Sequence, residues 1–539
     1  MRHTFARWGA AVSAGLLLAV AGCSAIDTPA GTPSTQDTRP PKMGGTLTVA
    51  LAEEPDALDP TTSRTLVGRS VFTSLCEKLY DINDKLEVVP QLAAALPDIS
   101  ADGTSVTIKL RSGVKFADGT TLDAAAVKTS LDRHRTLATS ARKSELSSVT
   151  DVSVSDPATV VLKLKEPFAP LIAQLADRAG MIMSPAALQS SGDANFGTNP
   201  VCVGPFKFSN RVAQDHIEVV KDPNYYDAAH VYLDKITYKI IADATTRFNN
   251  LKSGDVNVVD RPAATDVDAL TADPNLALLT SDSLGYQGIT INIGNINGVG
   301  KPGGQLPPNL ASPMSADPRV RQAFELSLDR DAINTVVFRG KYSPACGPIS
   351  PGSPYSSDAA QACPKHDPAA AKALLTQAGV AQPFKISMII ANTPDGARLG
   401  QAVQAQAKEG GFDLELVPTE FAASLDQTDK GNYQMFAIGW SGRVDPDGNI
   451  SNFVTTAGSQ NNNGYTNANV DSLLAQTRSK TDVAARRDLF GQVITQLHKD
   501  LPIIYLYRVK NFTGVSKSVV GVQMYGDGLM RFVHAGFAA

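Results

Sequence analysis

The chain of 539 residues is poor in the side chains that usually build metal and catalytic centres. It has five cysteines and seven histidines, with no CxxC pair and no histidines at zinc spacing. It also has no basic runs, and its net charge is −4 at pH 7. A mildly acidic chain of this kind argues against nucleic-acid binding and against broad electrostatic contact with a membrane. We therefore expect no metal, no cofactor and no nucleic-acid partner.

Long apolar runs are absent except at the N-terminus. Arg2 and Arg7 form a basic head, and Trp8 to Val20 is an apolar run too short to span a bilayer as a permanent helix. No later stretch approaches the length of a membrane span. The pattern predicts a secretory signal peptide over residues 1–22, which is removed from the mature protein.

A cysteine follows directly after the small residues that end this signal. Val20-Ala21-Gly22 precede Cys23, and this arrangement resembles the bacterial lipoprotein signal, in which the cysteine is lipidated. A plain secretory signal with an incidental cysteine is the alternative. Residues 23–43 are rich in Ser, Thr, Pro and Gly, which predicts a flexible tether. We expect an extracytoplasmic protein that is anchored to the cell membrane by lipid alone.

The four cysteines after Cys23 predict two disulfides, because an even number suits an oxidising compartment. Cys346 and Cys363 flank a loop rich in Pro, Gly and Ser, which favours a local Cys346–Cys363 bridge. Cys76–Cys202 is then the remaining pair. The alternative is a soft-metal site, which has neither a CxxC motif nor paired histidines to support it.

Strands and helices alternate along the chain. Apolar alternation predicts strands at 47–51, 106–110, 236–240 and 433–438. Asp-Pro and Gly signals predict helices after Asp317-Pro318, from Asp367-Pro368 to Gly379, and over 402–408. The sequence thus predicts an α/β protein, and its length requires at least two domains.

Several short segments occur in the order of a known family. They are GGTLTVAL, Leu58-Asp59-Pro60, SLCEKLYD, the run from PQLAAALPD to VKTSL, NPVCVGPFKF, LKSGDVNVV, DPRVRQAFELSLDRDAI, DPAAAKALLTQAG and Gly439-Trp440. Together they resemble the extracellular solute-binding proteins of family 5, the peptide- and nickel-type receptors of ABC importers. The resemblance covers nearly the whole mature chain.

This resemblance implies a two-lobed clamp of the periplasmic-binding-protein type II, with an extra subdomain as in cluster C. Lobe I is expected over 44–75, 198–290 and 499–539, the extra subdomain over 76–197, and lobe II over 291–498. The implied partners are a small-molecule or peptide ligand and the permease and ATPase subunits of an importer. We expect the receptor itself to be a monomer.

The segment Gly439 to Asn449 is the predicted ligand site, because it follows a strand end, where α/β proteins bind ligands. In peptide-binding relatives a Trp is followed three residues later by an Asp that grips the peptide's α-amino group. Here that position is Arg443, which repels an ammonium group and favours a carboxylate or phosphate. The segment is more similar to that of opine-, sugar-phosphate-opine- and glutathione-type receptors than to that of dipeptide receptors. Alternatively, Arg443 pairs with Asp445 or Asp447 and braces the loop.

The predicted ligand contacts come from this segment and from the strand that enters lobe II. They are Trp440, Ser441, Gly442, Arg443, Asp445, Tyr286 and Asn292. Core packing is the alternative role of Trp440, and a structural hinge role is the alternative for Asn292. Arg64 and Arg69 could add positive charge to the cleft, but we interpret them as solvated surface.

The predicted function is capture of a peptide-like or anionic amino-acid-derived solute, such as an oligopeptide, dipeptide, glutathione or opine, for delivery to an ABC permease. We expect no enzymatic activity. One alternative keeps the fold but makes it a sensor or ligand chaperone without transport. Another is a secreted hydrolase using Ser441, although GWSGR has Arg443 where the nucleophile elbow needs a glycine.

Overall fold

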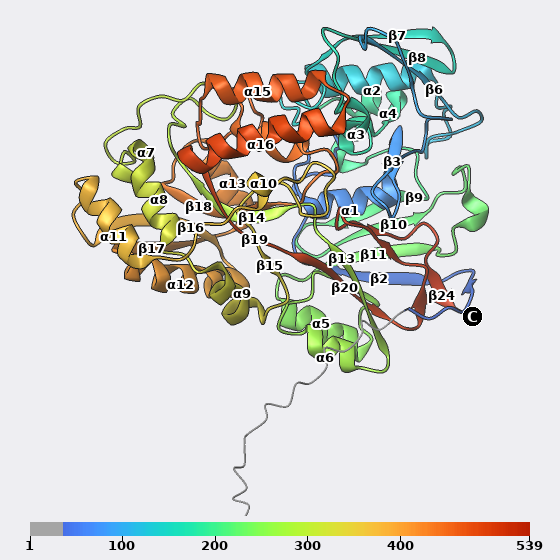
Figure 1. Cartoon of the computed structure of the whole chain (residues 1–539). Helices are drawn as coiled ribbons and strands as arrows, with labels where there is room; N and C mark the ends of the chain where they lie inside the picture. Colours follow the sequence, from blue (N-terminus) through green and yellow to red (C-terminus); the bar gives the residue numbers. More distant parts are fainter. Residues whose placement is uncertain (1–35) are drawn as a thin grey trace, which may run out of the picture. The chain divides into compact units, whose positions relative to one another are not determined.

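The computed structural model describes residues 36–539 (Figure 1). The predicted signal peptide and Cys23 lie outside the described residues. Pro41 and Lys42, the last part of the predicted tether, form a short strand that pairs with the chain's C-terminal strand.

A seven-stranded mixed sheet forms the centre of the first lobe. Its strands in spatial order are β13 (Leu276–Asp282), β20 (Lys510–Ser516), β12 (Val258–Asp260), β2 (Thr46–Leu51), β11 (Lys235–Ile240), β10 (His216–Lys221) and β9 (Phe206–Val212). Its helices are α1 (Leu66–Leu75), α5 (Ala244–Ser253) and α6 (Val267–Ala272). The strand β2 is central, and Leu47, Val49, Ala50 and Leu51 are all fully buried. Its two faces contribute to two different apolar clusters, which fixes its position in the sheet.

A four-stranded antiparallel sheet and several helices follow α1 in the chain. The strands are β5 (Asp98–Ile99), β6 (Ser105–Lys109), β8 (Thr159–Leu164) and β7 (Val149–Asp156). The helices are α2 (Ala124–Thr136), α3 (Leu171–Gln174), η1 (Arg178–Gly180), α4 (Pro185–Ser191) and η2 (Phe196–Thr198). This part shares one apolar core with the seven-stranded sheet, so it is an outgrowth of the first lobe.

A six-stranded sheet forms the second lobe. Its strands are β15 (Ser343–Pro344), β19 (Ile503–Arg508), β14 (Tyr286–Ile291), β18 (Met435–Trp440), β16 (Phe384–Ala391) and β17 (Phe412–Thr419). The helices are α7 (Pro313–Ala316), α8 (Pro318–Leu326), α9 (Arg330–Phe338), α10 (Asp358–Gln361), α11 (Pro368–Gln377), α12 (Pro394–Glu409), α13 (Phe421–Asp429), α14 (Asp447–Val454), α15 (Ala468–Ser479) and α16 (Val483–Asp500). This lobe has its own apolar cores.

Three small sheets complete the described fold. They are β1 (Pro41–Lys42) with β24 (Gly536–Ala538) and β21 (Val519–Val520), β3 (Tyr80–Ile82) with β4 (Val88–Pro90), and β22 (Gln523–Met524) with β23 (Met530–Arg531). A further short helix, η3 (Ala228–His230), precedes β11.

The chain crosses between the two large sheets at two adjacent points. Antiparallel β13 and β20 belong to the seven-stranded sheet, and their continuations, β14 and β19, belong to the six-stranded sheet. The crossings are residues 283–285 and Val509. Arg508 joins them, because its Nη1 donates to the Gly285 carbonyl at 2.6 Å. The lobe limits expected from the sequence, 291 and 498, remain a prediction.

Both expected disulfides are present, Cys76–Cys202 and Cys346–Cys363. The first ties the end of α1 to the segment before β9, and the second closes the loop that contains α10. The predicted strands correspond to β2, β6, β11 and β18. Helix α12 begins at Pro394, well before the predicted start at 402, because Thr393 caps it by accepting from the Gly396 amide.

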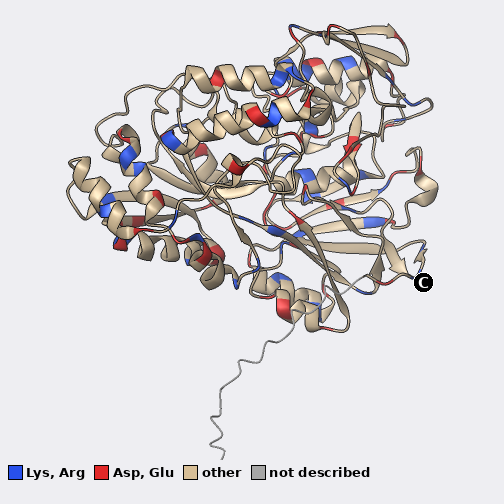
Figure 2. Ribbon diagram, viewed as in Figure 1, with Lys and Arg blue, Asp and Glu red and all other residues tan. Residues whose placement is uncertain are grey.

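Charges of both signs are distributed along the helices and strands (Figure 2). Within residues 36–539, no helix combines the length and apolar character needed to cross a membrane. In the same range, no three His, Cys, Asp or Glu side chains are grouped so that they could hold a metal ion.

Candidate ligand-binding site

The predicted site segment leaves the six-stranded sheet at the end of β18. Trp440 is paired with Tyr286 of β14 across the sheet, and its indole Nε1 donates to Asn449 Oδ1 at 3.0 Å. The same Oδ1 accepts from the Arg443 amide at 2.6 Å, and Asn449 Nδ2 donates to the Arg443 carbonyl at 2.9 Å. The side chain of Asn449 therefore closes the loop and fixes the direction in which Arg443 leaves it.

The guanidinium of Arg443 is buried between an aromatic ring and a carboxylate. Its Cζ lies 4.3 Å from the centre of the Trp440 ring, and its Nε forms an ion pair with Asp177. Nη1 donates to the Gly442 carbonyl at 2.8 Å and to Ser441 Oγ at 3.4 Å. Nη2 is buried and has no hydrogen-bond partner, so Arg443 retains a free donor.

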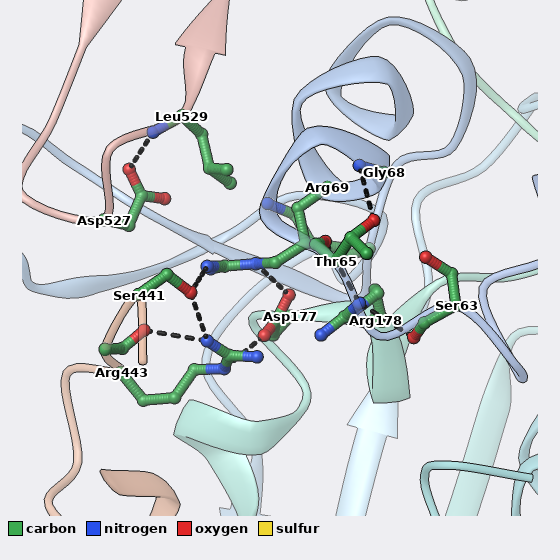
Figure 3. Close-up of polar contacts among 12 residues, drawn as sticks. Ser63, Thr65, Gly68, Arg69, Asp177, Arg178, Ser441, Arg443, Asp527 and Leu529 are labelled. Carbon is green, nitrogen blue, oxygen red and sulfur yellow. Dashed lines mark hydrogen bonds and ion pairs between the residues drawn. The ribbon is translucent and has the colours of Figure 1, made fainter. Parts of the chain in front are cut away.

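Asp177 also binds a second arginine, Arg69, which belongs to the same lobe as Asp177 (Figure 3). Arg69, on α1, donates from Nε to Asp177 Oδ1 at 3.0 Å and from Nη1 to Ser441 Oγ at 3.2 Å. The sequence-based interpretation of Arg69 as solvated surface is therefore wrong, since only 4% of this residue is exposed. The fold places it there because α1 is buried around most of its circumference.

Two further buried arginines adjoin this group. Arg178 Nη1 donates to the Ser63 carbonyl at 2.8 Å, and Arg142 Nη2 donates to the same oxygen at 3.1 Å. Arg142 also binds Glu145 Oε1 at 2.6 Å through Nη1. The Nε atoms of Arg142 and Arg178 are buried without a partner. We call the six residues Arg69, Arg142, Glu145, Asp177, Arg178 and Arg443 the arginine cluster.

The titration behaviour of the cluster reflects burial and the surplus of positive charge. Burial, reinforced by repulsion from Arg69, lowers the pKa of Arg443 to about 10 although Asp177 opposes the shift. Burial and then Arg142 lower the pKa of Arg178 well below its usual value. Burial alone would raise the pKa of Asp177, but Arg443, Arg69 and the other two arginines hold it well below its ordinary value. Asp177 is therefore ionised at neutral pH.

The cluster lies where the two lobes meet. Arg443 and Ser441 belong to the lobe with the six-stranded sheet, whereas Arg69 and Asp177 belong to the other lobe. A second ion pair joins the lobes, because Arg64 Nη1 donates to Asp429 Oδ2 at 2.5 Å. The lobes are thus in contact, and the arginine cluster is enclosed between them.

The other predicted contacts have different surroundings. Asp445 accepts from both Nη atoms of Arg486, at 2.7 and 2.8 Å, and Asp447 pairs with Arg478. Neither carboxylate is therefore the ion-pair partner of Arg443. Gly442 has a φ of +85°, which glycine adopts without strain, and this turn directs the chain toward Arg443.

Tyr286 and Asn292 lie at opposite ends of β14. The ring of Tyr286 packs against Tyr505 at 4.8 Å, and its hydroxyl is directed toward the Asn449 carbonyl at 3.5 Å, so it adjoins the site loop. The Asn292 amide instead donates to the carbonyls of Gly431 and Tyr433. These hydrogen bonds favour the alternative structural role of Asn292 over a contact with the ligand.

Ser441 has its hydroxyl between two cations. The hydrogen bonds to its Oγ come from Arg69 and Arg443, and a guanidinium cannot take a proton from a serine hydroxyl. A serine nucleophile needs a neighbouring base to activate it. The surroundings of Ser441 therefore do not support the hydrolase alternative.

Sequence reasoning missed Arg142, Glu145, Asp177 and Arg178. One local signal was present, because Asp177-Arg178 interrupts the apolar run 168–183, and charges in such a run are usually paired or functional. Arg142 and Glu145 lie in a polar stretch with no comparable signal. Their meeting with α1 and β18 depends on contacts between segments that are distant in the sequence.

Comparison with known proteins identifies the family. The sequence profile of the bacterial extracellular solute-binding proteins, family 5 Middle, matches residues 87–462. Over 500 residues the chain is 28% identical to the glutathione-binding protein GsiB of Pectobacterium atrosepticum, covering 90% of this chain and 93% of that protein.

Solved structures show the same fold. The binding protein AgaA of A. tumefaciens, in complex with agropinic acid, has a TM-score of 0.79 and 28% identity, and the match covers 91% of this chain and 96% of AgaA. DppA of Helicobacter pylori, in complex with the peptide STSA, has a TM-score of 0.82 and 23% identity, covering 92% and 99%. The predicted two-lobed clamp with an extra subdomain is thus confirmed. The chain belongs to the bacterial extracellular solute-binding proteins of family 5.

Proposed function

We propose that this protein captures a peptide-like or amino-acid-derived solute with an acidic group and delivers it to an ABC permease. Glutathione and opines are examples of such solutes. The relative GsiB is named as a glutathione-binding protein, and the structure of AgaA contains agropinic acid. In this proposal the mature protein is a monomer, and acyl chains on Cys23 anchor it to the outer face of the cell membrane.

One observation carries the proposal, namely the free Nη2 of Arg443 in a buried group rich in arginine. An ammonium group would be repelled there, whereas a carboxylate could accept charge-assisted hydrogen bonds from Arg443 and Arg69. Each such bond contributes about 1.5–3 kcal/mol. Trp440 lies beside the guanidinium and keeps it oriented through a cation–π contact.

The arrangement of the lobes supports capture by closure. The residues that would contact the acidic group come from both lobes, so a bound solute would make all its contacts only in the closed form. A ligand shifts a conformational equilibrium by its difference in affinity for the two states. The acidic group would therefore hold the lobes together, and a transport partner could distinguish loaded from empty receptor.

The first experiment is native mass spectrometry of the protein purified from its own host, followed by release and identification of any bound small molecule. We expect an amino-acid derivative or small peptide with an acidic group. Affinity for the released compound is then measured by calorimetry for the wild type, Arg443→Ala and Arg487→Ala. Arg487 lies on α16 with a side chain that is 44% exposed, so its variant controls for loss of charge alone.

Loss of one charge-assisted contact predicts about 10- to 100-fold weaker binding for Arg443→Ala, with no change for Arg487→Ala. Co-purification of a neutral peptide of mixed sequence would contradict the acidic-solute proposal. If Arg443→Ala binds an acidic ligand with unchanged affinity, Arg443 does not contact that ligand.

A further inference from the structure

The outgrowth of the first lobe, which carries β5 to β8 and α2 to α4, also touches the second lobe outside the arginine cluster. One contact place is the end of α15, and the other is the segment that contains α14 (Figure 1). The contacts proposed for the solute involve neither place. These contacts between the lobes therefore have a different role.

The end of α15 binds the outgrowth through its backbone and a side chain. The Ala169 amide, just before α3, donates to the Arg478 carbonyl at 2.8 Å. This carbonyl lies in the last turn of α15, where carbonyls have no partner within the helix. The Arg478 guanidinium lies over the Phe168 ring, with its Cζ 5.5 Å from the ring centre. Asp447, in the second lobe, holds this guanidinium in place by accepting from its Nε at 2.7 Å.

The second contact place consists of side chains that exchange hydrogen bonds across the lobes. Ser144 Oγ donates to Asn452 Oδ1, on α14, at 2.8 Å and lies 2.9 Å from Ser459 Oγ. Since Asn452 takes the proton of Ser144, the Ser459 hydroxyl donates to Ser144. Ser144 lies between Arg142 and Glu145 of the arginine cluster in the chain. The same turn therefore contributes to the enclosed cluster and binds the second lobe.

The two sides of these contacts belong to separate apolar cores. The buried residues of the core that the outgrowth shares with the seven-stranded sheet all come from the first lobe. Helices α14, α15 and α16 pack around a core of their own in the second lobe. The groups that meet between them are polar, apart from the Phe168 ring, and water can replace their partners when the lobes part. The contacts can therefore break and form again without disturbing either core.

We infer that the outgrowth is a latch that stabilises the closed form by holding α14 and α15. It moves with the first lobe, because it shares that lobe's core, and it releases the second lobe when the lobes part. Each neutral hydrogen bond of the latch favours the closed form by about two- to tenfold. The inference goes beyond the proposed function, because these contacts do not depend on the chemistry of the solute. The latch consists of Ser144, Phe168 and Ala169 on the outgrowth and Asn452, Ser459 and Arg478 on the second lobe.

Amide hydrogen exchange of the solute-stripped protein tests the latch. The Ala169 amide is bonded across the lobes, so its exchange rate reports how often the latch opens. Ser144→Ala removes the hydroxyl contacts of the second place and leaves the Ala169–Arg478 bond itself intact. We expect it to accelerate exchange at Ala169 about three- to tenfold. Ser190→Ala is the matched control, because the Ser190 hydroxyl bonds only within α4, and it should leave this rate unchanged.

The amides of β8 provide an internal reference in the same experiment. They bond to β6 and β7 within the outgrowth, so their exchange reports whether the outgrowth itself stays folded. Opening of the latch should leave their exchange rates unchanged. Faster exchange at both Ala169 and β8 would mean that Ser144→Ala loosens the outgrowth, and a second variant then decides.

The second variant makes the opposite prediction. Ser144→Cys with Ser459→Cys places two thiols where the hydroxyl oxygens are 2.9 Å apart. A disulfide between them should keep the latch closed and slow exchange at Ala169 at least tenfold. Ser459→Cys alone cannot form this bridge and is the matched control.

Three results would overturn the latch. They are an unprotected Ala169 amide in the wild type, an unchanged rate at Ala169 in folded Ser144→Ala, and an unchanged rate in the cross-linked variant. None of these measurements uses a solute. A co-purified solute without an acidic group would therefore contradict the proposed function and leave the latch intact.

Discussion

Glu77 shows how a single buried carboxyl makes stability depend on pH. It is 5% exposed and accepts hydrogen bonds from the hydroxyls of Tyr225 and Tyr226, at 2.6 and 2.9 Å. Burial nevertheless dominates and raises the pKa of Glu77 from 4.5 to about 7. The group also lines a cavity of about 490 Å³ that reaches Arg69 and Asp177, so its ionisation occurs close to the proposed site.

We predict that Glu77→Gln flattens the pH dependence of stability between pH 4.5 and 7. In this window the unfolded chain has lost the proton and the folded protein retains it, so the free energy of unfolding falls as pH rises, by about 3 kcal/mol. Below the window both states are protonated, and above it the effect is constant. Urea unfolding across the window measures the slope. The exposed Glu415 of β17 provides the control Glu415→Gln, and an unchanged slope in Glu77→Gln would contradict the assignment.

At the scale of elements, the site loop and the interlobe crossing pack backbone against backbone. A Cβ on Gly285 would overlap the Trp440 carbonyl, and one on Gly442 would overlap the backbone of Leu284. The end of β18 can therefore approach the crossing only because both positions lack a side chain. The position of Arg443 is thereby coupled to the crossing segment.

We predict that Gly285→Ala displaces the site loop, lowers the free energy of unfolding by about 1–3 kcal/mol and weakens solute binding. Trp440 is the only tryptophan within residues 36–539, so its fluorescence should report the displacement. Gly352→Ala is the matched control, because a Cβ at Gly352 meets no atom within 4 Å. If both variants behave alike, the close approach has no effect on the site.

The elements also show what local sequence can and cannot predict. Asp-Pro at 317–318 and 367–368 predicted two helix starts correctly, because capping and proline at the first turn are local effects. Arg443 could be predicted as a ligand-binding residue, because it departs from a family pattern within a short motif. The position of Arg69 in the site could not be predicted in this way, since its burial depends on where α1 meets β18 and η1. The apolar residues Val320, Phe324 and Leu328 have the spacing of one helical face, yet α8 ends at Leu326 and Leu328 is buried beyond that end.

For the whole molecule, the Arg64–Asp429 ion pair adds a contact between the lobes outside the arginine cluster. The two side chains are 28% and 27% exposed, so the pair is partly screened and contributes at most about 1 kcal/mol. It is present only when the lobes touch, and it therefore favours the closed form.

We predict that Arg64→Gln shifts the ligand-free protein toward the open form and weakens solute binding about two- to fivefold. Small-angle scattering should show a larger radius of gyration for the variant without solute and the wild-type value with saturating solute. Lys430→Gln is the control, because Lys430 and Asp426 form an exposed pair within one lobe. A wild-type radius in ligand-free Arg64→Gln would mean that this pair does not influence closure.

The paired crossings at 283–285 and Val509 also have a consequence for how the proposed solute would be released. The strands β13 and β20 continue into β14 and β19 at these crossings, so a movement of one lobe against the other would hinge there. The arginine cluster is enclosed by both lobes, so a solute bound there as proposed would leave only when the lobes part. Its dwell time is then limited by the frequency of lobe opening, and a permease that holds the lobes apart would accelerate release without touching the solute.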